Sequence, residues 1–180
     1  MARGGWLGTL LPALAAALLL PSAPLSAQDA PGDVEALPPI TLIRVHKAER
    51  RMELVDVDGR VHVIEGLQLG GDLLGPKHFE GDQKTPEGQY TIDWGNPNSA
   101  YHLSLHVSYP SADDTAYAVG QGRSAGGMIM VHGQPNDLPG ANSGVRAKGD
   151  WTDGCIALSN AQMDAVYRAV PDGTPIDILP

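Results

Sequence analysis

The clearest pattern in the chain is an alternation of apolar and polar residues over Tyr101–Tyr109. Tyrosine, leucine or valine occupies every second position, and histidine or serine occupies the positions between them. A period of two is typical of a strand with one buried face. We therefore predict a strand whose apolar side chains all point to one side: Tyr101, Leu103, Leu105, Val107 and Tyr109.

Other short segments rich in apolar and β-branched residues predict the remaining strands. A tight hairpin is expected at Asp58-Gly59, because this dipeptide favours the two-residue turn between paired strands. Glycine and proline punctuate the segments in between, as in loops. The expected strands are 40–46, 52–57, 61–64, 90–94, 128–132, 155–158 and 176–179.

Two segments have the residue pattern of helices. A short helix is expected over 112–119 and a stronger one over 160–170, where Ser159 or Asn160 can cap the first turn. The apolar residues of the second helix fall on one face: Met163, Val166, Tyr167 and Val170. The chain has no repeats, so we predict a single domain that is mainly β, with one or two helices packed on it.

The first residues predict a secretory signal peptide over 1–27. Arg3 gives a positive start, an apolar stretch runs to Leu20, and small residues lead to a cleavage site after Ala27. A membrane anchor is the alternative, but Pro12 interrupts the stretch, which is shorter than the roughly 20 residues that a spanning helix needs.

Removal of this signal leaves a flexible leader over 28–39 and a folded domain over 40–180. The leader is predicted from its prolines among small and acidic residues, and no later segment is apolar enough to span a bilayer. We therefore expect an exported protein of the periplasm or cell envelope, without a stable membrane span.

The amino-acid composition limits which partners and which chemistry the protein can have. The 180 residues carry a formal net charge of −9 and no basic run, which argues against nucleic-acid binding. The chain has one cysteine, Cys155, so it cannot form an internal disulfide. A lone cysteine in an exported protein is either a buried, inert thiol or a reactive one.

Two glycine-rich motifs overlap in 120–126, but neither has the required context. Gly120–Ala125 matches a dinucleotide-binding pattern, and Ser124 lies in a G-x-S-x-G motif typical of serine hydrolases. Both motifs need a preceding strand and a following helix, whereas here a strand is expected to follow. An exported serine hydrolase using Ser124 remains a minor alternative.

His102 and His106 are spaced like metal ligands on a helix. On the predicted strand they would lie roughly 13 Å apart, too far to share one ion. We therefore predict no metal site at this pair, although either histidine could line a groove.

Cys155 and His132 form the strongest candidate for catalysis. Cys155 follows Gly154 where a glycine-rich loop meets a strand, and glycine permits close approach of a substrate to the backbone. His132 ends another strand, and a thiol needs such a base to react near neutral pH. From these residues alone, a nucleophile–base pair and a buried structural cysteine both remain open.

Four segments carry a resemblance to a known family. They are 81–90, which contains Thr85-Pro86-Glu87-Gly88; 128–132; the dipeptide His132-Gly133; and Thr152-Asp153-Gly154-Cys155. In these segments, over about 40–180, the chain resembles the L,D-transpeptidase catalytic domain, often called the YkuD type. The Thr-Asp-Gly-Cys-Ile-Ala sequence is more similar to a YafK-like branch, which includes hydrolases.

This resemblance implies a β-sandwich-like fold and cysteine acyl chemistry on peptidoglycan stem peptides, without metal or cofactor. Cys155 would be the nucleophile and His132 the base, oriented by the Gly133 carbonyl. The amides of Gly154 and Cys155 would stabilise the oxyanion. Asp153 replaces the family's usual histidine, and Ala157 stands where many members have arginine, which weakens the case for transpeptidation more than for acyl transfer.

We therefore predict an exported L,D-transpeptidase-like cysteine transferase or hydrolase. Thr152, Asp153 and Arg123 are predicted to contact substrate, with Arg123 as a carboxylate ligand in place of the missing arginine. Arg146 or Lys148 is expected to offset the charge of Asp153. The rival function is a non-catalytic envelope-binding module of the same fold. Whether water or an amine completes the reaction, and whether 134–150 acts as a lid, are left open.

Overall fold

The structure is a computed structural model that describes residues 1–2, 4–5 and 37–180. The predicted signal peptide, 1–27, and most of the leader, 28–39, lie outside the described residues, so this division of the chain stays a prediction. Among the described residues, no helix has the length and apolar character needed to cross a membrane.

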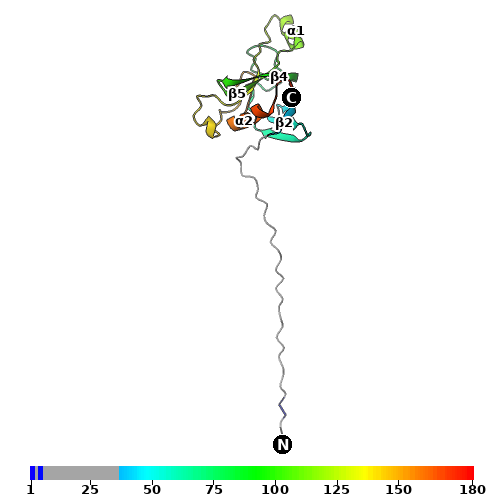
Figure 1. Cartoon of the computed structure of the whole chain (residues 1–180), viewed down its shortest axis with the longest axis vertical. Coiled ribbons are helices and arrows are strands. Elements are labelled where there is room, and N and C mark those ends of the chain that lie inside the picture. The colour runs from blue at the N-terminus through cyan, green and yellow to red at the C-terminus, as the bar shows by residue number, and fades with distance from the viewer. Residues whose placement is uncertain (3, 6–36) are drawn as a thin grey trace. The chain divides into compact units, whose positions relative to one another are not determined.

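Residues 37–180 contain eight strands, two α-helices and one short 3-10 helix (Figure 1). The strands are β1 (Ile40–His46), β2 (Arg51–Asp56), β3 (Val61–Glu65), β4 (Gly88–Ser99), β5 (His102–Val107), β6 (Met130–His132), β7 (Ile156–Ala157) and β8 (Thr174–Leu179). The helices are α1 (Ala112–Gly120), η1 (Ala141–Ser143) and α2 (Asn160–Ala169).

All eight strands belong to one hydrogen-bonded sheet in the order β3-β2-β1-β8-β4-β5-β6-β7. The β1–β8 and β6–β7 pairs are parallel, and the other pairs are antiparallel. The sheet is curled, and its two α-helices lie on either side of β4 and β5 in Figure 1. The predicted fold class, mainly β with one or two helices, is confirmed. The predicted sandwich-like arrangement is formed by a single sheet that curls.

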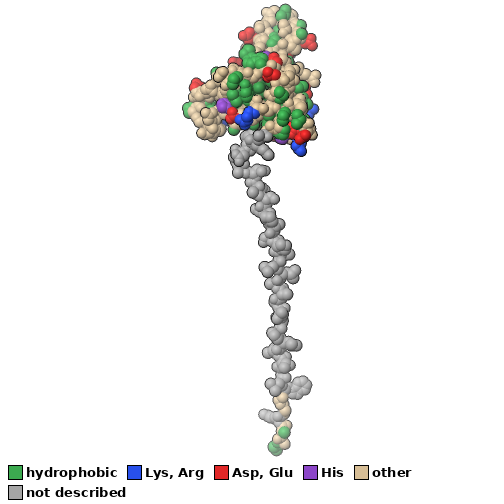
Figure 2. Space-filling view, in the orientation of Figure 1, with side chains coloured by type: hydrophobic (Ala, Val, Ile, Leu, Met, Phe, Trp, Pro, Cys, Tyr) green, Lys and Arg blue, Asp and Glu red, His purple; other side chains and the backbone are tan. Residues whose placement is uncertain are grey.

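Local sequence signals explain several elements. β1 has the predicted bounds, and β2 and β3 form the expected antiparallel hairpin, with Gly59 at a φ of 78° in its turn. Ser159 caps α2 and forms a capping box with Gln162. Figure 2 shows that hydrophobic side chains on the visible face of the domain lie in small groups among polar ones.

Two expectations about β4 and β5 need correction. β4 extends to Ser99 instead of ending at Trp94, because pairing with β5 continues past Gly95, and Gly95 leaves room for the Tyr167 ring. Tyr101 precedes β5 and is 40% exposed, so it does not share the buried side of Leu105 and Val107.

The two faces of the sheet differ at β5, β6 and β7. Leu105 pairs with Val131, Val131 pairs with Ile156, and all three side chains lie in the hydrophobic core. On the other face, Ser104 pairs with His132 and is itself buried. The predicted alternation therefore holds at Leu105 and Val107, and on the polar face Ser104 is covered. This polar face carries the candidate site.

Candidate active site

The pairing of β6 with β7 brings Cys155 and His132 to the same face of the sheet. His132 pairs with Ala157, and Cys155 lies two residues before Ala157, so both side chains project from one face. The Met130 N–H points to Cys155 Sγ at 3.4 Å, which places the sulfur against β6. Side chains in such diagonal positions are close enough to interact.

His132 has the orientation of a general base. Its Nδ1 lies 2.7 Å from the Gly133 carbonyl oxygen, which can only accept a hydrogen bond. Nδ1 therefore carries the proton, and in the neutral ring Nε2 has the free lone pair. The rings of Tyr101 and Trp151 lie 4.7 Å and 5.6 Å from the His132 ring, between centroids, and hold it in place.

Gly133 can orient His132 because it fits a tight space. A Cβ at this position would lie 2.7 Å from Asn160 Oδ1 and 2.8 Å from the Cβ of His102. The Gly133 N–H also donates to the Tyr101 and Leu103 carbonyls. A larger residue would displace the carbonyl that holds the histidine.

Burial keeps the two candidate catalytic groups neutral. It lowers the pKa of His132, and the Gly133 carbonyl opposes this shift in part. It also raises the pKa of the Cys155 thiol; the Met130 N–H and the Lys77 charge lower that pKa, whereas the Asp153 charge raises it further. Near neutral pH the pair is therefore a thiol beside an imidazole.

The loop before Cys155 is shaped by Thr152 and Gly154. The Thr152 hydroxyl donates to the Cys155 carbonyl at 2.8 Å and accepts from the Gly154 N–H at 3.2 Å. Gly154 has a φ of +127°, and a Cβ there would collide with the Lys84 carbonyl oxygen. Thr152 is buried, so its hydroxyl supports the loop; the predicted substrate contact of Thr152 stays a prediction.

Comparison with known proteins identifies the family. The L,D-transpeptidase catalytic domain model, YkuD, matches residues 40–178. This chain belongs to that family. YafK of Escherichia coli strain K12 is 27% identical over 135 residues, which cover 71% of this chain and 46% of YafK.

Solved structures show the same fold. The helical cell shape determining protein Pgp2 of Campylobacter jejuni is 28% identical, with a TM-score of 0.60, over 77% of this chain and 47% of Pgp2. Bd1075 of Bdellovibrio bacteriovorus is 22% identical, with a TM-score of 0.51, over 78% of this chain and 48% of Bd1075. The chain thus spans about half the length of these relatives.

Lys77 is a charged residue of this L,D-transpeptidase domain that the sequence analysis missed. Its side chain is buried, and Nζ donates to Asp82 Oδ1 at 2.9 Å, to the Phe79 carbonyl at 3.1 Å and to the Asp153 carbonyl at 3.4 Å. Burial raises the pKa of Asp82, but Lys77 and three backbone N–H groups outweigh it and bring this pKa down to about 2. Lys77 and Asp82 thus form an ion pair beside the loop that precedes Cys155.

The cation that contacts Asp153 is Lys77, through the Asp153 backbone carbonyl, whereas Arg146 or Lys148 was expected to offset the Asp153 charge. Arg146 instead donates to the Ala157 carbonyl at 3.5 Å, and the Lys148 side chain is exposed. Asp153 is exposed and, with Lys77 and Glu80, lines a hollow of about 350 Å³ next to the loop that precedes Cys155. Only the fold brings Lys77 close, because 76 positions separate it from Asp153.

Arg123 and Ser124 lie in the loop between α1 and β6. The guanidinium carbon of Arg123 is 3.8 Å from the centroid of the Phe79 ring, a cation–π contact with the turn that holds Lys77. Its role as a carboxylate ligand stays a prediction. Ser124 follows a helix and precedes a strand, the reverse of a nucleophile elbow, and its hydroxyl accepts the Gly126 N–H at 3.0 Å.

The two histidines with metal-ligand spacing are held by different carboxylates. His102 Nε2 lies 2.8 Å from Asp164 Oδ1, and His106 Nδ1 lies 2.6 Å from Asp93 Oδ1. His106 also stacks on Trp94. Their separate partners fit the prediction that they do not act as one pair.

Buried carboxamides support the strands that carry Cys155 and His132. Gln134 is fully buried; its Nε2 donates to the Leu158 carbonyl at 2.6 Å and to Gln68 Oε1 at 3.1 Å, and its Oε1 accepts the Ala147 N–H at 2.7 Å. Gln68 pairs with Ala157 through its backbone. This network fixes both ends of the 134–150 loop to the sheet beneath the site.

Proposed function

We propose that this domain is an exported cysteine acyltransferase or hydrolase that acts on peptidoglycan stem peptides through a thioester on Cys155. Family membership implies activity related to peptidoglycan. The observation that carries the proposal is the register of β6 and β7, with Cys155 and His132 on one face and His132 Nδ1 bound to the Gly133 carbonyl.

In the proposed reaction, His132 Nε2 takes the Sγ proton as the sulfur attacks the carbonyl of the third stem-peptide residue. The Cys155 N–H has no acceptor within residues 37–180 and would donate to the oxyanion. The Gly154 N–H, expected to share this role, already donates to Thr152. Collapse of the tetrahedral intermediate expels the amine, which takes the proton from His132 and leaves the thioester.

The second half-reaction decides between a hydrolase and a transpeptidase. Water or an amine attacks the thioester, and His132 accepts its proton and returns a proton to the leaving thiolate. We favour hydrolysis, because Asp153 stands in the Thr-Asp-Gly-Cys-Ile-Ala motif, which resembles the YafK-like branch that includes hydrolases. Similarity to Pgp2 supports a role in cell wall biogenesis and cell shape.

The direct test is incubation of the purified protein with muropeptides, with and without an amine acceptor, followed by mass spectrometry. A shortened stem peptide is expected from hydrolysis, and a cross-linked product is expected from transpeptidation. Unchanged muropeptides, together with binding to intact cell walls, would instead support the non-catalytic envelope module. Mass analysis of the secreted chain tests export, which predicts an N-terminus at Gln28.

The reactivity of the free thiol provides a second prediction. Because burial raises the Cys155 pKa, the rate of alkylation by iodoacetamide should be slow near neutral pH and should keep rising above the ordinary thiol pKa of about 8.5. Lys77→Met removes a cation and should move this profile to higher pH; Asp153→Asn removes an anion and should move it to lower pH.

Two control variants distinguish an effect of charge on the alkylation profile from an effect of altered structure. Lys77→Arg keeps the cation and should restore most of the wild-type profile. Lys148→Met removes an exposed cation of the neighbouring loop and should leave the alkylation profile unchanged. Alkylation that is already fast at pH 6, or a profile that neither Lys77→Met nor Asp153→Asn alters, would contradict this account of the site.

A further inference from the structure

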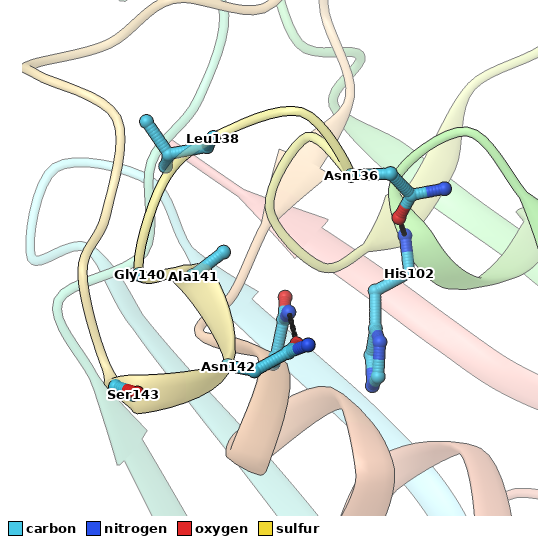
Figure 3. Close-up of a pocket in the computed structure, with 8 residues that line it drawn as sticks. His102, Asn136, Leu138, Gly140, Ala141, Asn142 and Ser143 are labelled. Atoms are coloured by element: carbon cyan, nitrogen blue, oxygen red, sulfur yellow. Dashed lines mark hydrogen bonds between the residues drawn. The ribbon is translucent and has the colours of Figure 1, made fainter.

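Two hollows lie beside the catalytic histidine, on the side of Tyr101. The first, of about 440 Å³, is lined by Tyr101, Trp151, Asn136 and Asp137 among others. The second, of about 520 Å³, shares Asn136 with the first and lies under the 134–150 loop (Figure 3). The two hollows meet at Asn136 and are together called the groove.

The groove begins at the catalytic site. The Tyr101 ring contacts both the His132 ring, at 4.7 Å between centroids, and the Trp151 ring, at 5.7 Å. In the second hollow, Asn160 and His102 also lie against Gly133, next to His132. A ligand in the groove would therefore lie directly next to the group that orients His132.

The second hollow is lined mainly by neutral polar groups held in fixed positions. Asn160 Nδ2 donates to Asn142 Oδ1 at 2.6 Å, and Asn136 Oδ1 accepts the His102 N–H at 2.8 Å, as Figure 3 shows. The amide nitrogen of Asn142 and the hydroxyl of Ser143 are exposed and have no hydrogen-bond partner within residues 37–180. These groups remain free to bind a ligand.

The charges of the groove restrict what it can bind. Neither hollow has a lysine or arginine among the residues that line it, so it offers no partner for the carboxylates of a peptide. Its one carboxylate is that of Asp137, at the surface, and the His102 ring is bound to Asp164. A half-exposed aromatic pair next to amide and hydroxyl groups suits an uncharged ligand with apolar faces and many hydroxyls.

We propose that this groove binds the glycan strand of peptidoglycan, a neutral polymer of N-acetylated amino sugars. This inference rests on the proposed function, since it assumes that the substrate peptide is attached to a sugar. The reacting carbonyl belongs to the third residue of the stem, and three extended residues span roughly 10 Å. A strand in a groove that begins at His132 is within that reach of Cys155.

In this arrangement the Tyr101 and Trp151 rings stack on a sugar face, and Asn142 and Ser143 bind its hydroxyl or acetamido groups. The 134–150 loop is then a wall of the glycan site, which gives a role to its 3-10 helix, η1. Peptides attached to a strand would bind more tightly than free peptides, because the sugar adds contacts that a free peptide lacks.

The test is calorimetric titration of the full chain with N-acetylchitotetraose, a soluble chitin oligomer. We expect a dissociation constant of about 1 mM or below. Asn142→Ala should weaken binding about fivefold, the effect of one lost hydrogen bond. Trp151→Ala should abolish measurable binding, whereas Trp94→Ala, which removes a partly exposed tryptophan stacked on His106, should leave it unchanged.

The same variants distinguish this proposal from the catalytic one. Asn142→Ala should raise the KM for a glycan-linked muropeptide more than the KM for a sugar-free stem peptide. No sugar binding at about 10 mM, or displacement of the sugar by a free stem peptide, would overturn the glycan site. Sugar binding without any thioester would leave the groove intact and overturn the proposed catalysis.

Discussion

Replacing Cys155 by alanine or serine should abolish thioester formation and muropeptide turnover while leaving the fold intact. Cys155 is the only cysteine of the chain, so no other thiol can substitute for it. A serine hydroxyl is a much weaker nucleophile, because the alkoxide is harder to form than a thiolate. We expect kcat/KM to fall by more than about 10⁴-fold, as in other nucleophile–base units.

His132→Ala should be about as damaging as Cys155→Ala, and the double variant should be no worse than either single one. Circular dichroism and thermal unfolding should show that the Cys155 variants are folded. Ser124→Ala is the matched control for the serine hydrolase hypothesis and should retain full activity. Turnover by a folded Cys155→Ser protein would refute the central proposal.

Gly154→Ala should impair both stability and activity, although it adds only one methyl group. The φ of +127° is a backbone conformation that only glycine adopts readily, and the new Cβ would collide with the Lys84 carbonyl. Strain and overpacking together should lower the free energy of unfolding by about 3 kcal/mol. Displacement of the adjacent nucleophile should lower kcat/KM by more than about a hundredfold.

Gly173→Ala is the matched control for this prediction. Gly173 also has a left-handed φ, of +92°, but a Cβ there would meet nothing within 4 Å. It should cost only about 1 kcal/mol, from the backbone conformation alone, and leave activity unchanged. Chemical denaturation of both variants measures the difference. If Gly154→Ala and Gly173→Ala lost equal stability, the contact with the Lys84 carbonyl would not contribute to the effect of Gly154→Ala.

The sequence predicted the parts of this molecule that depend on neighbouring residues. Alternation located β5, a segment rich in β-forming residues located β1, the Asp58-Gly59 pair located a hairpin, and a cap at Ser159 or Asn160 located α2. Motif order identified Cys155 and His132 as a candidate pair, and the family assignment is confirmed. The catalytic roles themselves remain proposals.

Contacts between distant segments could not be predicted. Lys77 lies in a glycine- and proline-rich loop, and no local pattern indicates that it reaches the loop before Cys155. The Gly-Asn-Pro sequence after Trp94 is typical of a turn, yet it remains in β4 because the partner strand continues to pair with it. The aromatic contacts of His132 likewise join residues from separate loops.

The position of β8 has a consequence for how the protein is made. β8 is the last strand in chain order but lies fourth in the sheet, between β1 and β4. The sheet therefore remains in two unjoined parts until the ribosome has synthesised β8. Until then β1 and β4 both lack their shared partner strand, so the complete sheet forms only after β8 has left the ribosome. A chain whose sheet is incomplete can still be threaded through a narrow translocation pore, as the proposed export requires.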